Sequence, residues 1–115
     1  MEMREEMKEE VLVIALEGEL MGGEESKRLQ ERITQAIQED TISVVLNMGG
    51  VKWMNSSGLG MLMASLTTLR GSGGDVRLAH VSDRVRRPIE VTKLNRVIKM
   101  YESVDKAVKS YKGGG

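Results

Sequence analysis

The sequence predicts an α/β fold in which a mainly parallel sheet is covered by helices. Short apolar runs of strand length alternate along the chain with segments whose apolar residues recur at helical spacing. Parallel strands need crossover connections, and helices usually supply them. The 115 residues suffice for one core. We therefore expect a single domain over residues 1–112, followed by a flexible glycine tail at 113–115.

The first half of the chain reads as strand, helix, strand. Val11–Leu16 is a buried strand closed by Gly18, and the Glu-rich start before it fits an edge strand. The helix that follows is marked by an apolar stripe at i, i+4, i+7 and i+8, made of Leu29, Ile33, Ala36 and Ile37. Residues 42–48 form the next buried strand, which we expect Gly49 and Gly50 to stop.

The second half continues the alternation. A helix from Ser57 is ended by the glycine-rich turn at 71–74, and a strand follows at 76–81. Pro88 opposes one continuous helix from Ser82, so a tight turn is expected first and the helix from about Pro88. Residues 97–100 form a last strand. Ser103 then caps a terminal helix whose inward residues are Val104, Ala107, Val108 and Tyr111.

Composition excludes several classes of function. The chain has no cysteine and one histidine, which disfavours a metal site, and no cofactor is expected. Only 3% of residues are aromatic, so the stacking platforms of single-stranded nucleic-acid binders are lacking. No apolar run approaches the roughly 20 residues of a spanning helix, and the acidic start does not resemble a signal peptide. We expect a cytoplasmic protein that neither inserts into membranes nor binds nucleic acid.

The charges are distributed unevenly although the formal net charge is zero. Acidic side chains outnumber basic ones up to Gly50, and basic ones dominate from Arg77 onward. Such asymmetry either orients a partner or simply marks solvated helix faces, and the second reading is the commoner one.

The segment between Met48 and Ser57 is the first candidate for function, because sites in such folds usually lie in loops that leave the carboxyl ends of strands. It places Ser56 and Ser57, with Gly58 and Gly60, at the start of a helix. The first turn of a helix has N–H groups without partners, which a serine can cap and which favour a phosphate. Capping accounts for one serine and suits Ser57. It leaves Ser56 less explained.

The run from Met54 to Gly60 resembles the Asp-Ser-Ser/Thr-Gly-Leu-Gly signature of STAS-domain anti-sigma factor antagonists. Other segments extend the match over about Val11 to Tyr111: Leu16–Leu20, Val44–Asn47, the glycine-rich turn before Val76, Thr92–Leu94 and Glu102–Ala107. The resemblance implies the STAS fold, with four to five mainly parallel strands, an antiparallel edge strand and about four helices.

In that family the first hydroxyl of the signature is phosphorylated by an anti-sigma factor that is a serine kinase, and a serine phosphatase restores it. The resemblance thus implies that Ser56 is the phosphoacceptor, with Ser57 as the alternative. The unmodified form would bind the anti-sigma factor and release a sigma factor. A weak homodimer is also compatible with the resemblance.

Asn55 departs from the family pattern, which has aspartate at this position. An amide forms hydrogen bonds but supplies no negative charge. The departure allows a constitutively binding form that is not phosphorylated. Asn47 also stands where many relatives carry aspartate, and we assign it a loop-capping role.

The expected partner-binding residues surround the same helix start. They are Trp53, Met54, Asn55, Ser56, Ser57, Gly58, Leu59 and Met61. Trp53 suits an interface anchor, although partial burial as a packing residue is the more frequent role of a lone tryptophan.

Two other classes of function compete with this prediction. A hydrolase would need glycines two places before and after its serine, and neither Ser56 nor Ser57 has the first of them. The sequence therefore predicts a binding protein and no enzyme. The stronger alternative is a non-phosphorylated STAS subunit of a lipid-transport or stress-signalling complex, which Asn55 makes credible.

Overall fold

The computed structural model describes residues 1–112 and contains a five-stranded sheet with the order β1-β2-β3-β4-β5. The strands are β1 Glu2–Lys8, β2 Val11–Leu20, β3 Ser43–Met54, β4 Asp75–Ala79 and β5 Lys99–Tyr101. β1 is antiparallel to β2, and the other neighbouring pairs are parallel. The predicted α/β class, the mainly parallel sheet and its antiparallel edge strand are confirmed.

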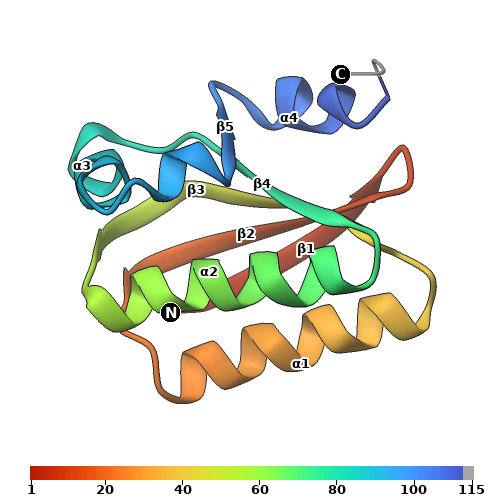
Figure 1. The fold of residues 1–115 in the computed structure, drawn as a ribbon, viewed down its shortest axis with the longest axis horizontal. Coiled ribbons are helices and arrows are strands. Elements are labelled where there is room, and N and C mark those ends of the chain that lie inside the picture. The colour runs from red at the N-terminus through yellow and green to blue at the C-terminus, as the bar shows by residue number, and fades with distance from the viewer. Residues whose placement is uncertain (113–115) are drawn as a thin grey trace.

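Helices cover both faces of this sheet (Figure 1). They are α1 Glu24–Gln38, α2 Ser56–Gly71, α3 Asp83–Val91 and α4 Val104–Ser110, with a short 3-10 helix, η1, at Leu94–Arg96. α1 and α2 run side by side along one face, while α4 packs on the other. Among residues 1–112 the number of α-helices is thus the predicted four.

The two-residue period of the strands divides the core into two clusters. Leu12, Ile14 and Leu16 of β2 join the larger cluster, which includes buried residues of α1, α2 and α3. Val11 and Val13 point to the opposite face and pack with Ala107 and Val108 of α4, as do Val104 and Tyr111. The predicted inward face of the terminal helix is confirmed. Ser103 caps that helix, since its Oγ accepts a hydrogen bond from the N–H of Lys106 at 3.1 Å.

β3 does not end at Gly49 and Gly50, so the predicted boundary is wrong. The strand continues to Met54, and its partner β2 continues to Leu20. Gly50 does not form a turn but allows β3 to lie close to β2. A Cβ at this position would lie 2.7 Å from the Cγ of Glu17 and 3.0 Å from the carbonyl oxygen of Leu16. Asn47 consequently lies inside the strand and not in a loop, although its Oδ1 does accept a hydrogen bond from the N–H of Gly49 at 3.0 Å.

The expected turn before Pro88 is also absent. α3 begins at Asp83 and runs through Pro88, after the Ser82 Oγ accepts a hydrogen bond from the N–H of Val85. Val85 and Ile89, four residues apart, are both buried in the larger cluster. Proline removes one helical hydrogen bond, whose acceptor would be the carbonyl of the exposed residue Arg84. The burial of Val85 and Ile89 therefore outweighs the lost bond.

One further boundary differs from the expectations, and one expectation is not tested. The last strand is displaced by about two residues, because Val97 ends η1 and only Lys99–Tyr101 pair with β4. The predicted glycine tail at 113–115 lies outside the described residues.

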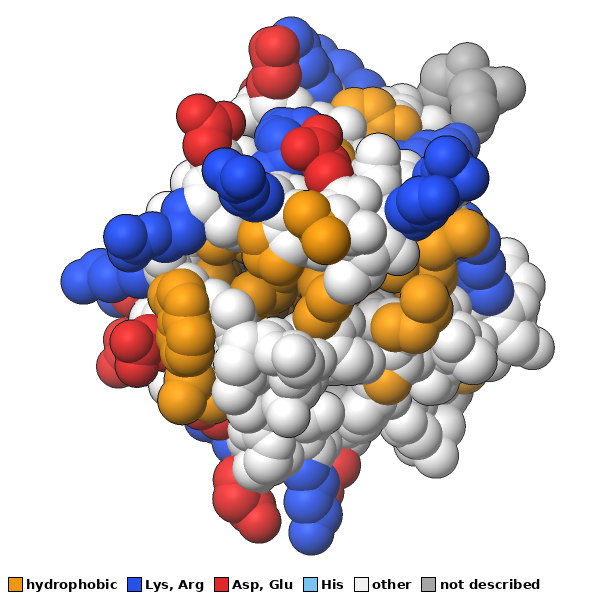
Figure 2. All heavy atoms as spheres, turned by 60° about the vertical axis from the view of Figure 1, so that its left-hand side comes forward, with side chains coloured by type: hydrophobic (Ala, Val, Ile, Leu, Met, Phe, Trp, Pro, Cys, Tyr) orange, Lys and Arg blue, Asp and Glu red, His pale blue; other side chains and the backbone are white. Residues whose placement is uncertain are grey.

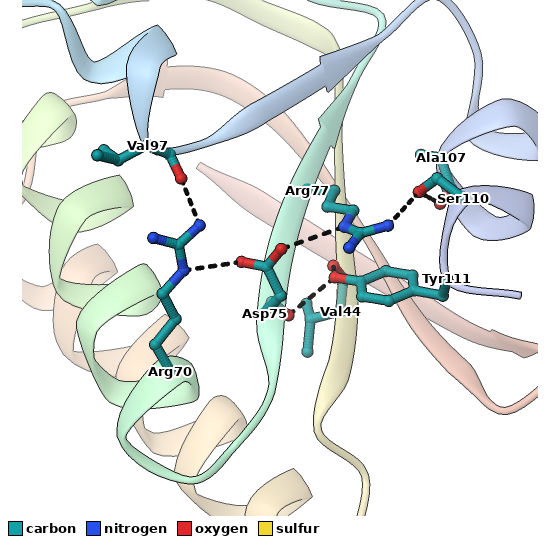
Figure 3. Close-up of polar contacts among 8 residues, drawn as sticks. All are labelled: Val44, Arg70, Asp75, Arg77, Val97, Ala107, Ser110 and Tyr111. Atoms are coloured by element: carbon teal, nitrogen blue, oxygen red, sulfur yellow. Dashed lines mark hydrogen bonds and ion pairs between the residues drawn. The ribbon is translucent and has the colours of Figure 1, made fainter. Parts of the chain in front are cut away.

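Tyr111 joins α4 to the sheet through its hydroxyl group (Figure 3). The hydroxyl oxygen lies 2.7 Å from the carbonyl oxygen of Val44 on β3 and 2.8 Å from that of Asp75 on β4. The guanidinium carbon of Arg77 stacks 4.0 Å from the centre of the ring, and the Nε of Arg77 donates to the Asp75 carboxylate at 3.1 Å. Burial, helped by the nearby Asp75 carboxylate, raises the pKa of Tyr111 above its usual value.

We expect Tyr111→Phe to lower the free energy of unfolding by about 1 kcal/mol, because the shared hydroxyl hydrogen bond is lost. Urea unfolding at pH 7 measures this. The raised pKa means that the folded state holds the phenolic proton more tightly than the unfolded state does. The wild-type stability advantage should therefore be complete below about pH 10 and decline as the pH rises further. Tyr101→Phe is the control, and equal stability of Tyr111→Phe and wild type would contradict the prediction.

Candidate functional site

The candidate site lies where β2 and β3 end together and α2 begins. Leu20 and Met54 are the last paired residues of the two strands. The next residue, Asn55, donates its backbone N–H to the carbonyl oxygen of Leu20 at 3.2 Å. The start of α2 is thereby fixed at the carboxyl edge of the sheet, which is where the fold class predicted the site.

Asn55 caps α2. Its backbone is extended, its Oδ1 accepts a hydrogen bond from the N–H of Gly58 at 2.8 Å, and its carbonyl oxygen accepts one from the N–H of Leu59 at 3.0 Å. The interpretation of Ser57 as the cap is therefore wrong. Because the amide of Asn55 takes the capping role, both serine hydroxyls of the first turn are left for other contacts.

Two glycines let neighbouring segments approach the start of the helix. Gly58 is buried, and a Cβ at this position would overlap the carbonyl oxygen of Leu20. Gly22 has φ +85°, and a Cβ there would lie 2.6 Å from the Cβ of Ser57. Gly58 is consequently a packing position within the chain, and its expected contact with a partner stays a prediction.

Ser56 and Ser57 are both exposed, but they face different neighbours. Ser57 lies against the loop that contains Gly22. Ser56 borders a hollow of about 260 Å³ between α2 and the segment after α3, whose other lining residues are Leu59, Gly60, Met63, Thr92 and Leu94. Figure 2 shows this side of the molecule, with apolar side chains gathered in a depression across its middle. The two hydroxyls are therefore chemically alike but differently placed.

The remaining predicted contact residues divide by burial. Met54 is 6% exposed and Met61 1%, and both belong to the core of the free chain. Their expected contact with a partner stays a prediction. The sequence suggested that these two methionines lie at the surface only because they lie on either side of the serines. Asn55 and Leu59 are partly exposed, and Trp53 is 41% exposed near the end of β3. The surface that a partner can reach thus comprises Trp53, Asn55, Ser56, Ser57 and Leu59.

Four residues of the hollow, Gly60, Met63, Thr92 and Leu94, are not among the predicted contact residues. Met63 follows Ser56 by seven residues, so the helical period alone would have placed it on the same face. Thr92 and Leu94 come from more than thirty residues further along, and only the fold brings them to Ser56. No local pattern could have identified them as neighbours of the serines.

The chemistry available here is that of exposed hydroxyl groups. Within residues 1–112 neither Ser56 nor Ser57 forms a side-chain hydrogen bond to a histidine or a carboxylate, as an activated nucleophile would. In the same part of the chain, no three His, Asp or Glu side chains come together in a way that would hold a metal ion. None of the helices described is both long and apolar enough to cross a membrane.

Comparison with known proteins agrees with this architecture. The model of the STAS domain family matches residues 2–107. The anti-sigma-B factor antagonist of Staphylococcus aureus is 30% identical over 77 residues, which cover 67% of this chain and 71% of that protein. An anti-sigma factor antagonist from Mycobacterium paratuberculosis has a similar fold, with a TM-score of 0.82 at 22% identity, over 96% of this chain and 93% of that one.

The phosphorylated form of the Bacillus cell fate determinant SpoIIAA also shares the fold, with a TM-score of 0.73 at 22% identity, over 96% of this chain and 99% of that one. These two structures support the fold, while the family model and the staphylococcal relative establish the family. The chain belongs to the STAS domain family and, within it, to the anti-sigma factor antagonists.

Proposed function

We propose that this protein binds an anti-sigma factor that is a serine kinase, releases a sigma factor by doing so, and is regulated by phosphorylation of Ser56. One observation carries the proposal: Ser56 presents an exposed hydroxyl at the start of α2, where Asn55 already supplies the cap. The names of the relatives, anti-sigma factor antagonists, support the same role. The protein acts by binding and not by catalysis, in the cytoplasm.

The position of Ser56 suits a phosphate that switches binding. The first turn of α2 contains no acidic residue, and the partial positive charge of a helix start favours an anion. Phosphorylation adds about −1.5 to −2 charges and considerable bulk at this surface. An anti-sigma factor packed against the unmodified helix start would be repelled, and a serine phosphatase would reverse the change.

A second function is favoured by one residue. Asn55 keeps the capping hydrogen bond that an aspartate would form, but it contributes no negative charge beside Ser56. A protein of this kind would bind its partner without being switched, as a subunit of a lipid-transport or stress-signalling complex. Phosphorylation experiments separate the two functions.

We expect wild-type protein incubated with ATP and the serine-kinase anti-sigma factors of the source genome to gain one phosphate, on Ser56. Intact-mass and peptide mass spectrometry measure this. Ser57 faces Gly22 in the wild-type protein, so the Ser57→Ala variant should still be phosphorylated on Ser56. The Ser56→Ala variant should not be phosphorylated. Tight binding of a kinase without any phosphate transfer would reject the switch and favour the second function.

We expect Asn55→Ala to lower the free energy of unfolding by about 1 kcal/mol, because the cap of α2 is lost. Asn55→Asp should keep the cap and raise stability by about 0.5 kcal/mol through the helix dipole, and it should be phosphorylated faster. Urea unfolding and a time course of phosphate incorporation test these effects. Gln35→Glu, the same amide-to-carboxylate change in the last turn of α1, is the control, and it should not raise stability because the dipole at that end is reversed. Equal stability of all four proteins would show that Asn55 is not the cap in solution.

A further inference from the structure

β1 is an edge strand of the sheet. It pairs with β2 on one side, and among residues 1–112 no strand lies on its other side. The backbone groups that point outward from β1 can therefore pair with a strand of another chain. β1 has seven residues, whereas β5, the strand at the opposite edge, has three. An edge of this length either carries features that prevent pairing or serves as an interface.

Four charged side chains lie on the face of β1 that points the same way as α4. In the register with β2, Glu6 lies opposite Val13, which packs on α4. Side chains alternate along a strand, so this face of β1 carries Glu2, Arg4, Glu6 and Lys8. Within residues 1–112 neither Glu2 nor Arg4 forms an ion pair, and Lys8 lies 3.8 Å from both Glu6 and Asp105. These charges are therefore largely available to another chain.

The opposite face of β1 points toward α1 and carries Met3, Glu5 and Met7. Arg32 of α1 holds the Glu5 carboxylate through two hydrogen bonds, of 2.7 and 2.8 Å. Met7 is 55% exposed, although it lies opposite Leu12, which is 1% exposed. An apolar side chain in this position gains burial when a second strand covers the edge.

We propose that β1 pairs with β1 of a second copy of this chain, antiparallel and centred on Glu5, to form a symmetric dimer with one continuous sheet. The order of the charges carries this inference. In this register Glu2 lies opposite Lys8 of the second copy, and Arg4 lies opposite its Glu6. Two-fold symmetry repeats both contacts, so every charge of this face meets a charge of the other sign.

Other registers do not pair the charges in this way. In a symmetric antiparallel pair, side chains that lie opposite each other share one face of the sheet, so the centre must fall on a residue. Centred on Arg4, the pairing would oppose two arginines and place Glu2 against Glu6. Centred on Glu6, it would oppose two glutamates and place Arg4 against Lys8. Larger shifts leave half of the four charges without a partner. Charges that only prevented pairing would need no such order.

The other face of β1 is compatible with the same register. Met3 of each copy would lie opposite Met7 of the other, and Glu5 would lie on the axis beside its own copy. Two bare carboxylates there would repel, but each is already held by Arg32 of its own chain. The hollow beside Ser56 stays accessible, because it lies between α2 and η1, whereas β1 contacts β2 and α1. The dimer would present two copies of the candidate site, and its formation does not depend on the proposed function.

Sedimentation velocity of the wild-type chain, without any partner, measures this association. A strand pair of seven residues is a small interface, so we expect reversible dimerisation with a dissociation constant of roughly 100 µM. The measurement therefore covers protein concentrations from about 10 µM to about 1 mM. Because ion pairs at the surface contribute, the dimer should be weaker at about 0.5 M salt than at about 0.05 M salt.

Charge reversal tests the register. Arg4→Glu and Glu6→Arg, each alone, should weaken the dimer about tenfold or more, because like charges then face each other twice. An equimolar mixture of the two variants should associate again, since one carries glutamate at both positions and the other carries arginine. The double variant Arg4→Glu/Glu6→Arg should dimerise for the same reason. Arg87→Glu is the matched control, because it makes the same change at an exposed position of α3, which packs on β3 and η1. Circular dichroism checks that all variants are folded.

Wild type that stays monomeric at the highest concentration would overturn the inference and show that the charges protect the edge from pairing. Equal dimerisation of Arg4→Glu, Glu6→Arg and the control would place the contact elsewhere and overturn it too, and so would a mixture that fails to associate. None of these results affects the proposed function, which the phosphorylation experiment tests. If wild type alone stayed monomeric and Arg4→Glu weakened binding of the anti-sigma factor, the edge would belong to that partner and the inference would be wrong.

Discussion

β2 and β3 pair up to the last residue of each strand, and this pairing determines where the start of α2 and its serines lie. Leu20 and Met54 end the ladder together, and the carbonyl oxygen of Leu20 then receives the N–H of Asn55. Gly58 packs on the same carbonyl group, where no side chain would fit. The first turn of α2 is therefore held by backbone contacts on both sides, and its serines are presented from a rigid frame. A site built on such a frame needs no induced rearrangement to present a hydroxyl.

The different roles of Asn55, Ser56 and Ser57 follow from the way the start of α2 is held. Asn55 caps the first turn through the N–H of Gly58, so neither Ser56 nor Ser57 is needed as the cap. The loop at Gly22 occupies the side of Ser57, while Ser56 opens onto the hollow formed with η1. Position, and not chemistry, thus distinguishes two adjacent residues with the same side chain.

The sequence predicts the fold well because burial follows simple periods. The stripe from Leu29 to Ile37 and the apolar run from Val11 to Leu16 were correctly assigned, since each buries one face or the whole of an element. The wrong predictions concern glycine and proline. Gly50 permits close packing inside a strand and Pro88 lies within a helix, because tertiary contacts outweighed the local preferences of both residues.

The site could be predicted only in part for a related reason. A signature identifies residues that are adjacent in sequence, but it does not separate the buried Met54 and Met61 from the exposed Ser56. Thr92 and Leu94 reach the hollow through the crossover that follows β4, which no local pattern records. What remained hidden was therefore the far wall of the hollow.

The position of Trp53 gives the molecule an optical reporter of its own. It is the only tryptophan of the chain, it is 41% exposed, and it lies two residues before the cap of α2. An indole in water emits at longer wavelengths than an indole covered by apolar groups. A protein that settles over this end of β3 would shift the fluorescence toward the blue, so complex formation can be followed on unmodified material, without a dye attached near the serines.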